Sequence, residues 1–314
     1  MAFRFKIVPE TTAFDFQAKN KIAAIFSAFL LVGAIGVFLA QGLNLGIDFR
    51  GGILLEARTT EQQADIPALR RDLGQLQLGE VSIQSFGGPQ DVLIRVQRQE
   101  GDEKAQIAAL EKITASLGDN YDVRRTEFVG PTVGAELQEK GILAVICALL
   151  AIMVYIWFRF EWQFAVAAIL ALTHDILSTI GLFAVTSFEF NLATVAAILT
   201  IAGYSINDTV VVFDRVRENL RRYKSYEQRE ILNLSLNETL SRTVMTSVTT
   251  ALALIAIIIF GGAVLRDFAI ALLWGVAIGT YSSIFIAVGF LSRFDLKAAA
   301  EEADEETGEG AQNG

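Results

Sequence analysis

The sequence predicts an α-helical membrane protein with six transmembrane helices and one α+β domain inserted after the first of them. Hydrophobic residues make up 53% of the 314 residues and charged residues only 19%, and the mean hydropathy is +0.44. A soluble domain carries about a quarter charged residues. Uncharged apolar runs of about 18 residues are long enough to cross a bilayer as a helix. We identify six spans, at 22–41, 141–158, 162–188, 191–213, 242–260 and 268–291.

Basic residues near the ends of the six spans predict how the chain is oriented. Lys and Arg accumulate in the cytoplasmic loops of membrane proteins. Here they cluster before the first span, between the second and third, between the fourth and fifth, and after the sixth. All four segments fall on one side of a six-span topology. We therefore expect both termini in the cytoplasm and residues 43–139 on the outer side.

These boundaries divide the chain into five parts. We expect a cytoplasmic N-terminus at 1–21, a first helix at 22–42, an outer domain at 43–139, five helices within 140–292 with a cytoplasmic loop at 214–240, and an acidic cytoplasmic tail at 293–314. Residues 300–314 hold six acids and no base, which is typical of a solvated, disordered segment. The net charge of −9 therefore says little about the folded part, and no nucleic-acid partner is expected.

Changes of pattern within 43–139 predict a small α+β domain. Alternating apolar and polar residues at 81–86 and 91–96 flank Gly87-Gly88-Pro89, which is a hairpin signal. Further elements are expected as strands at 53–58 and 121–129 and helices at 67–76 and 104–117. The resulting βαββαβ order is the ferredoxin-like arrangement. No catalytic cluster is evident in it, so we expect a binding or mechanical module.

Three spans contain ionisable residues, which cost roughly 2.5–3.5 kcal/mol each to insert and are therefore functional candidates. His174 and Asp175 lie near the middle of the third span, and Asp208 follows Asn207 in a dense polar stretch of the fourth. We place all four in a candidate proton relay. The alternative for the acids is a structural role, in which they only form hydrogen bonds between helices.

Arg242 opens the fifth span, in a stripe of polar residues spaced three and four apart. A basic residue at a helix end can simply extend toward the membrane surface. Because Asp208 lies at a similar depth on the preceding span, we instead expect an ion pair between the two, and Arg242 joins the candidate relay. Gly275 and Gly279 have the spacing of close helix contacts, and with Gly203 they are the candidate helix-packing positions.

Several enzyme signatures are absent from the sequence. It contains no G-x-x-x-x-G-K-[ST] phosphate-binding loop, so we do not expect the chain to hydrolyse ATP. One histidine and one cysteine cannot build a usual zinc site. We therefore expect no enzyme activity, no cofactor and no metal, and transport driven by an ion gradient or by a partner.

Five segments of the sequence resemble those of a known family. They are LGIDFRGG at 45–52, GPTVG at 130–134, HD at 174–175, GYSINDTVVVFDRVREN at 203–219 and LSRT at 240–243. The long segment in the fourth span is the most specific of them. Over about residues 12–295 the chain resembles the SecD/SecF family of the bacterial protein-translocation machinery, which belongs to the resistance-nodulation-division superfamily.

The resemblance implies one half of a twelve-span unit in the bacterial inner membrane, with a SecD-like subunit as the other half. Such a unit works beside the SecY-SecE-SecG channel and uses the proton-motive force to draw preproteins across. The family's intramembrane aspartate and arginine correspond to Asp208 and Arg242, and residues 43–139 correspond to its periplasmic domain. We expect Gly275 and Gly279 to take part in packing against the second subunit, whose relay residues this chain cannot supply.

Two other functions fit the same features. Half of a small-molecule or lipid efflux pump of the same superfamily would be expected to carry a larger outer domain with a substrate cleft. A purely structural scaffold of the translocation channel would use Asp208 and Arg242 only to hold helices together. Dependence of translocation on the membrane potential distinguishes a proton-coupled subunit from such a scaffold.

Overall fold

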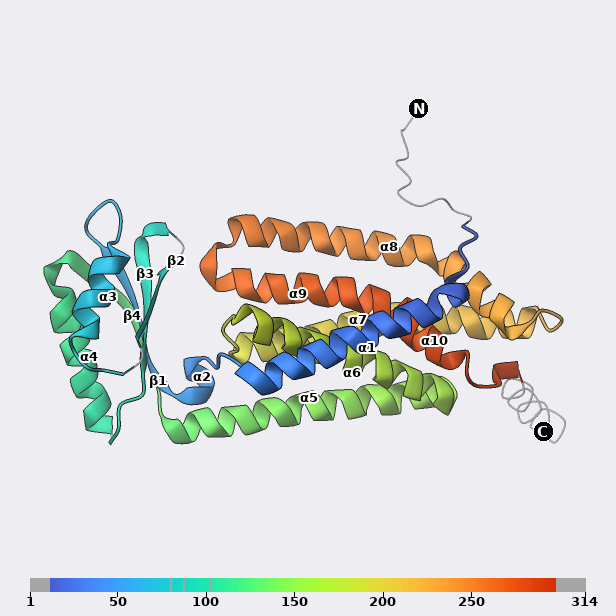
Figure 1. Ribbon diagram of the computed structural model, residues 1–314, viewed down its shortest axis with the longest axis horizontal. Coiled ribbons are helices and arrows are strands. Elements are labelled where there is room, and N and C mark those ends of the chain that lie inside the picture. The colour runs from blue at the N-terminus through green and yellow to red at the C-terminus, as the bar shows by residue number, and fades with distance from the viewer. Residues whose placement is uncertain (1–11, 80, 87, 102, 298–314) are drawn as a thin grey trace, which may run out of the picture.

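The computed structural model describes residues 12–297 except 80, 87 and 102, so most of the predicted acidic tail lies outside the described residues. Six long helices lie alongside one another, and a small α/β domain is attached at one end of them (Figure 1). Each of the six is long and apolar enough to cross a membrane, which confirms the predicted fold class. They are α1 (Phe16–Gln41), α5 (Pro131–Arg159), α6 (Trp162–Thr186), α7 (Leu192–Arg222), α8 (Gln228–Phe260) and α9 (Gly262–Ser282).

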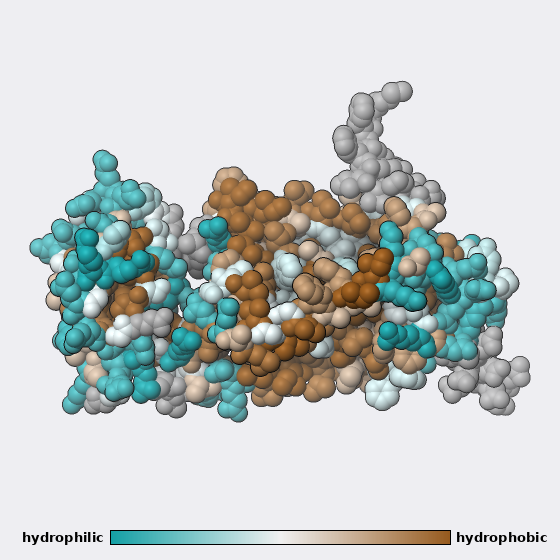
Figure 2. All heavy atoms as spheres, viewed as in Figure 1, coloured by the Kyte–Doolittle hydropathy of each residue, from teal (hydrophilic) through white to brown (hydrophobic). Residues whose placement is uncertain are grey.

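An apolar belt surrounds the helices. Figure 2 shows hydrophobic residues over the middle of the molecule, with hydrophilic residues gathered toward its two ends. Large apolar side chains in this belt are exposed, among them Phe29 (78%), Phe158 (89%) and Ile259 (64%). Removing apolar surface from water gains roughly 25 cal/mol per Å². Exposed side chains of this size on one continuous belt therefore indicate contact with lipid hydrocarbon.

The sixth span is not a regular α-helix throughout. Helix α9 passes into a π-helical turn, η2 (Ser283–Ala287), and then into α10 (Val288–Leu291). Single π-helical turns inside α-helices are rare and often mark functional sites. Here the turn begins where two consecutive serines, Ser282 and Ser283, are both completely buried in the helix bundle.

The outer domain has the predicted βαββαβ order. Its elements are β1 (Gly52–Thr59), α3 (Ile66–Gly74), β2 (Val81–Phe86), β3 (Gly88–Gln97), α4 (Glu103–Leu117) and β4 (Tyr121–Val129). The strands form one antiparallel sheet in the order β2-β3-β1-β4, which is the ferredoxin-like topology. Helices α3 and α4 lie on one face of the sheet (Figure 1), and Leu55, Ile94 and Ile113 are buried in the core between them.

Several contacts fasten the outer domain to the membrane helices. The short helix α2 (Ile47–Arg50) supplies Asp48, whose carboxylate accepts a hydrogen bond from the backbone N–H of Leu192, the first residue of α7. On the sheet, Arg95 forms a 2.6 Å ion pair with Glu189, which lies between α6 and α7. Burial raises the pKa of Glu189, and the charge of Arg95 opposes that rise. These contacts give any movement of α7 a direct path to the outer domain.

The segment 214–240, which we predicted as a loop, is mostly helical. Helices α7 and α8 extend into it from both sides, and only residues 223–227 connect them. The many charged residues of this segment led us to predict a loop. Its helical character is visible in Val216 and Leu220, which are spaced one helical turn apart and are both buried. Hydropathy marks where a helix leaves the membrane, and a helix can continue beyond that point.

The three candidate packing glycines differ from one another. A Cβ atom at Gly279 would lie 3.1 Å from the Cβ of Ser205, and one at Gly275 would overlap Ile201, so α9 approaches α7 closely at both positions. We expected these two glycines to pack against a second subunit. They pack within the chain instead, because the missing side chains let the backbones of α7 and α9 approach. Gly203 is exposed on α7, with nothing within 4 Å of such a Cβ.

Candidate functional site

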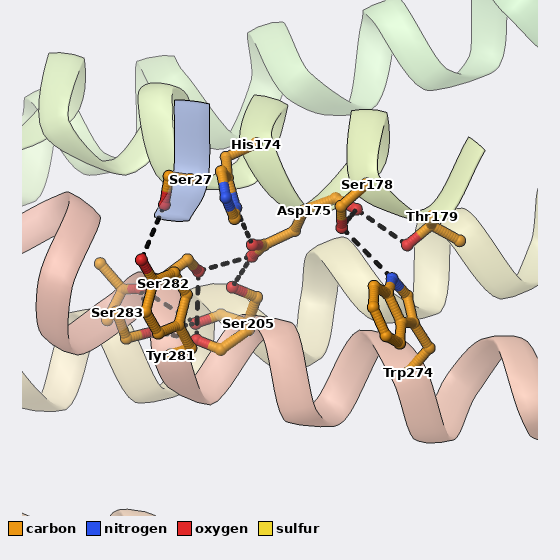
Figure 3. A network of polar contacts seen from close by, with 12 residues as sticks. Ser27, His174, Asp175, Ser178, Thr179, Ser205, Trp274, Tyr281, Ser282 and Ser283 are labelled. Atoms are coloured by element: carbon orange, nitrogen blue, oxygen red, sulfur yellow. Dashed lines mark hydrogen bonds and ion pairs between the residues drawn. The ribbon is translucent and has the colours of Figure 1, made fainter. Parts of the chain in front are cut away.

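The carboxyl group of Asp175 joins three membrane helices (Figure 3). Asp175 lies on α6 and is completely buried. Its Oδ2 accepts hydrogen bonds from the Oγ of Ser205 on α7 at 2.6 Å and from the Oγ of Ser282 on α9 at 2.8 Å. Its Oδ1 lies 3.1 Å from the Nδ1 of His174. A buried carboxyl group is costly unless its oxygens are bonded, and here both oxygens have partners.

Hydroxyl groups extend this contact along α7. The Oγ1 of Thr209 donates to the carbonyl oxygen of Ser205 at 3.1 Å and lies 2.8 Å from the Oγ of Ser283. All three of these residues are buried. The link from Ser205 to Thr209 and Ser283 runs through the backbone carbonyl oxygen of Ser205, which accepts hydrogen bonds but cannot donate one. These contacts therefore hold the helices together without forming a continuous proton path from Asp175 to Asp208.

A second branch of the network reaches α1. The ring of Tyr281 lies 6.0 Å from that of His174, and its hydroxyl donates to the carbonyl oxygen of Ala23 at 2.7 Å and lies 2.8 Å from the Oγ of Ser27. The Nε2 of His174 is buried and has no hydrogen-bond partner among the described residues. A ring nitrogen in this situation can donate or accept a hydrogen bond, depending on the tautomer.

Asp208 forms a second site with fewer partners. It lies on α7 and is only 2% exposed. The Oγ1 of Thr246 on α8 donates to its Oδ1 at 3.5 Å, which is a long hydrogen bond. Its Oδ2 has no partner in the described part of the chain. The two acids therefore differ: both oxygens of Asp175 are bonded, whereas Asp208 keeps one oxygen that a proton can occupy.

The expected ion pair between Asp208 and Arg242 is not formed. Arg242 lies on α8 one turn before Thr246, whose Oγ1 is 3.2 Å from the Arg242 carbonyl oxygen. The Arg242 side chain is exposed and makes no ion pair within the described ranges. Arg242 lies well inside α8, which begins at Gln228, so it is not at a helix end as we expected. Its long basic side chain nevertheless extends toward water, which was the alternative that we set aside.

Arg242 lines a cavity of about 720 Å³ between the end of α5, the last turns of α7 and the first half of α8. Six arginines and three acids line this arginine cavity: Arg159, Arg215, Arg217, Arg221, Arg222, Arg242, Asp214, Glu218 and Glu238. Two of its lining residues, Val211 and Arg242, are three and four residues from Asp208 and Thr246, which is roughly 5 Å along each helix. The cavity thus brings a polar environment to within about one turn of the Asp208 carboxyl.

Asn207 lies outside both clusters. It is exposed on α7, as Gly203 is one turn earlier. We placed Asn207 in the relay because it is next to Asp208 in sequence, but successive residues of a helix point in different directions. An uncovered amide in the membrane is costly. We therefore expect this face of α7 to be in contact with another protein surface.

Sequence reasoning missed Tyr281, Ser282 and Ser283 as members of the network. A signal for them was present, because Thr280 to Ser283 is a run of four polar residues in the middle of the sixth span. The first of the run, Thr280, lies 2.6 Å from the Oγ of Ser247 and so joins α9 to α8. Polar runs at such a depth indicate buried partners on other helices.

Two family models match the chain. The model described as "Protein export membrane protein SecD/SecF, C-terminal" matches residues 109–297, and the "SecD/SecF GG Motif" matches residues 36–63. The protein translocase subunit SecF of Rickettsia felis is 44% identical over 297 residues, covering 93% of this chain and 95% of the relative. That of Cereibacter sphaeroides is 44% identical over 317 residues, covering 98% of each.

Solved structures agree with these matches. The crystal structure of SecDF, a translocon-associated membrane protein from Thermus thermophilus, superposes with a TM-score of 0.80 at 37% identity, covering 91% of this chain and 39% of that chain. SecDF in its super-membrane-facing form gives a TM-score of 0.69 at 38% identity, covering 94% and 40%. The chain belongs to the SecF branch of the SecD/SecF family, whose members are non-enzymatic, multi-pass inner-membrane components of Sec protein translocation.

Proposed function

We propose that the chain uses the proton-motive force to promote passage of preproteins through the SecY-SecE-SecG channel, in a complex with a SecD-like subunit. The observation that carries the proposal is the carboxyl of Asp208, which is buried in a membrane-spanning helix with one oxygen unbonded. A proton can bind and leave at that oxygen. The arginine cavity supports the proposal because it offers protons a polar approach from one end of the bundle.

Arg242 controls the charge of Asp208 in this mechanism. An arginine keeps its charge at any relevant pH, and a positive charge close to a carboxyl favours the ionised form. When α8 moves so that the guanidinium approaches Asp208, the carboxyl releases its proton, and when the guanidinium withdraws, the carboxyl takes one up. Moving one charge through the full membrane potential yields about 2.3 kcal/mol per 100 mV. That energy shifts a two-state equilibrium more than tenfold.

The outer domain is the element that this change would move. Asp208 lies on α7, and the first residue of α7 is bonded to Asp48 of the segment that leads into the outer domain. The ion pair of Arg95 with Glu189 adds a second contact close to the same end of α7. A shift of α7 that follows protonation would therefore tilt the domain relative to the membrane and act on a preprotein outside it.

A SecD-like subunit would cover the exposed face of α7. Gly203 and Asn207 lie on that face, where a polar amide requires protein rather than lipid. Transporters built from repeats place their pathway at the interface of the two halves. The SecDF chain of Thermus thermophilus is more than twice as long as the part that this chain covers, which supports a second half supplied by another protein.

The proposed orientation, with both termini in the cytoplasm, rests on the basic segments and is tested by thiol labelling. In a background with Cys147→Ser, single cysteines at Ser85 and Asp119 are expected to react with an impermeant maleimide added to the periplasmic side. A cysteine at Ser225 is expected to react only after the membrane is opened. All three positions are exposed, so accessibility in the fold does not bias the comparison. Labelling of position 225 in sealed cells would overturn the proposed topology.

Depletion of the chain tests the export function. We expect slower signal-peptide cleavage of a secreted reporter in pulse-chase experiments, recovery when the chain is supplied again, and loss of that recovery when a protonophore is added. Half of an efflux pump behaves differently. If depletion leaves export unchanged and instead causes a small molecule or lipid to be retained, the proposal is wrong and the efflux function is favoured.

A further inference from the structure

The arginine cavity carries more positive charge than its own acids balance. Its six arginines and three acids leave a difference of three positive charges. Arg159 is paired with Asp214 at 2.9 Å and Arg215 with Glu218 at 2.8 Å, so two of the three acids are already engaged by arginines of the cavity. The third acid, Glu238, accepts a hydrogen bond from Asn219 at 2.7 Å and lies 3.5 Å from Arg215.

Two arginines of the cavity have no acidic partner within the residues that the structure describes. Arg242 is exposed and forms no ion pair there. Arg222 lies over the ring of Tyr223, with its guanidinium carbon 5.3 Å from the ring centre, and also has no acid beside it. These two guanidinium groups are therefore available to bind an anionic ligand in the cavity.

The described part of the chain ends beside this cavity. The Nζ of Lys297, the last described residue, donates to the carbonyl oxygen of Lys224 at 2.9 Å, and the backbone N–H of Leu296 donates to the Oε1 of Gln228 at 2.9 Å. Lys224 follows α7 by two residues, and α7 supplies most of the cavity wall. The chain then continues with the acidic segment 301–309, EEADEETGE, which holds six acids and no base.

We infer that the acidic segment 301–309 of this chain binds in the arginine cavity. Its charge is complementary to the uncompensated arginines, and its length suffices. Seven extended residues from Lys297 to Asp304 span up to roughly 23–25 Å. The nine residues of helix and turn between Arg215 and Lys224 rise only about 14 Å. Tethering gives such a segment an effective concentration in the millimolar range, so weak contacts are sufficient to hold it.

The binding depends only on charge and proximity and is tested without any transport measurement. Because the contact is between charged groups near the surface, it should weaken as the ionic strength rises.

Cross-linking of paired cysteines tests the inference in the full-length chain. In the Cys147→Ser background, Ala303→Cys is combined with Glu218→Cys in the cavity or with Arg229→Cys as the matched control. The two native side chains are similarly exposed, at 55% and 58%, but Arg229 is paired with Asp15 at the start of α1 and does not line the cavity. With a short bismaleimide we expect intramolecular cross-linking to position 218 to be at least about tenfold faster than to position 229, given typical electrostatic enrichment in charged clefts.

Two further arms of the experiment can overturn the inference. The preference for position 218 should disappear when the tail acids Glu301, Glu302, Asp304, Glu305, Glu306 and Glu309 are replaced by Gln or Asn, and it should fall at high salt. Equal rates at both positions, or a preference that survives neutralisation, would overturn it. In nanodiscs that contain phosphatidylglycerol the preference should persist. Its absence there would overturn the inference for an anionic membrane, because a lipid headgroup would then be the occupant of the cavity.

Discussion

Replacing Asp175 with alanine is expected to lower the free energy of unfolding of the purified chain by about 2–4 kcal/mol. The substitution leaves the buried hydroxyls of Ser205 and Ser282 and the ring of His174 without their acceptor. An unsatisfied buried polar group costs about 1–3 kcal/mol, although hydrogen bonds between membrane helices average only about 0.6 kcal/mol. The expected loss therefore lies above that of three hydrogen bonds at the smaller value and below that of three unsatisfied groups at the larger value. Unfolding by heat or by graded denaturing detergent measures the effect.

Two variants make that measurement specific. Asp175→Asn keeps an acceptor oxygen in the same place, so its loss should be smaller than that of Asp175→Ala. Asp214→Ala removes an exposed acid that is paired with Arg159, and exposed ion pairs contribute less than about 1 kcal/mol. If Asp175→Ala is no less stable than Asp214→Ala, the Asp175 network does not hold α6, α7 and α9 together.

In the wild type we expect the proton-motive force to stimulate export more than tenfold. Replacing Asp208 with asparagine is expected to abolish this stimulation. Asparagine keeps the size of the side chain and can accept the hydrogen bond from Thr246, but it cannot titrate. The chain should therefore still assemble with its SecD-like partner. Export of a secreted reporter with and without a protonophore, together with co-purification of the partner, measures both properties.

A control lies in the outer domain. Asp119→Asn changes an exposed aspartate far from the buried site in sequence, so it should leave the sensitivity to protonophore intact. Arg242→Lys should retain part of the activity, since lysine supplies the charge without the planar guanidinium group. An Asp208→Asn chain that assembles and exports with undiminished sensitivity would leave Asp208 with a structural role only.

The fold was largely predictable because its strongest signals are local. Six apolar stretches predicted six spans, and the alternation at 81–86 and 91–96 predicted the β2–β3 hairpin. The ends of the helices were harder to predict. Helices α7 and α8 continue into charged sequence, where the packing of residues such as Val216, and not hydropathy, maintains the helix. The fastening of the outer domain by Arg95 and Glu189 joins residues 94 positions apart, which no local pattern could reveal.

The site was predictable residue by residue but not in its contacts. Ionisable residues in apolar sequence drew attention to Asp175 and Asp208, and both are buried. Which helix faces turn toward each other depends on tertiary packing, so Ser282 was not connected with Asp175, 107 positions away. The same limit explains the ion pair that we expected between Asp208 and Arg242, because depth along two helices does not determine where a long side chain points.

Proton flux through the assembled complex is the most direct measurement of proton coupling at Asp208. The chain and its SecD-like partner are reconstituted in liposomes that contain a pH-sensitive dye, and a potassium gradient with valinomycin imposes the membrane potential. We expect potential-driven flux through the wild-type complex and through Asp119→Asn, and flux no higher than in protein-free liposomes for Asp208→Asn. Equal flux through the wild-type and Asp208→Asn complexes would contradict the assignment of Asp208 as the proton site.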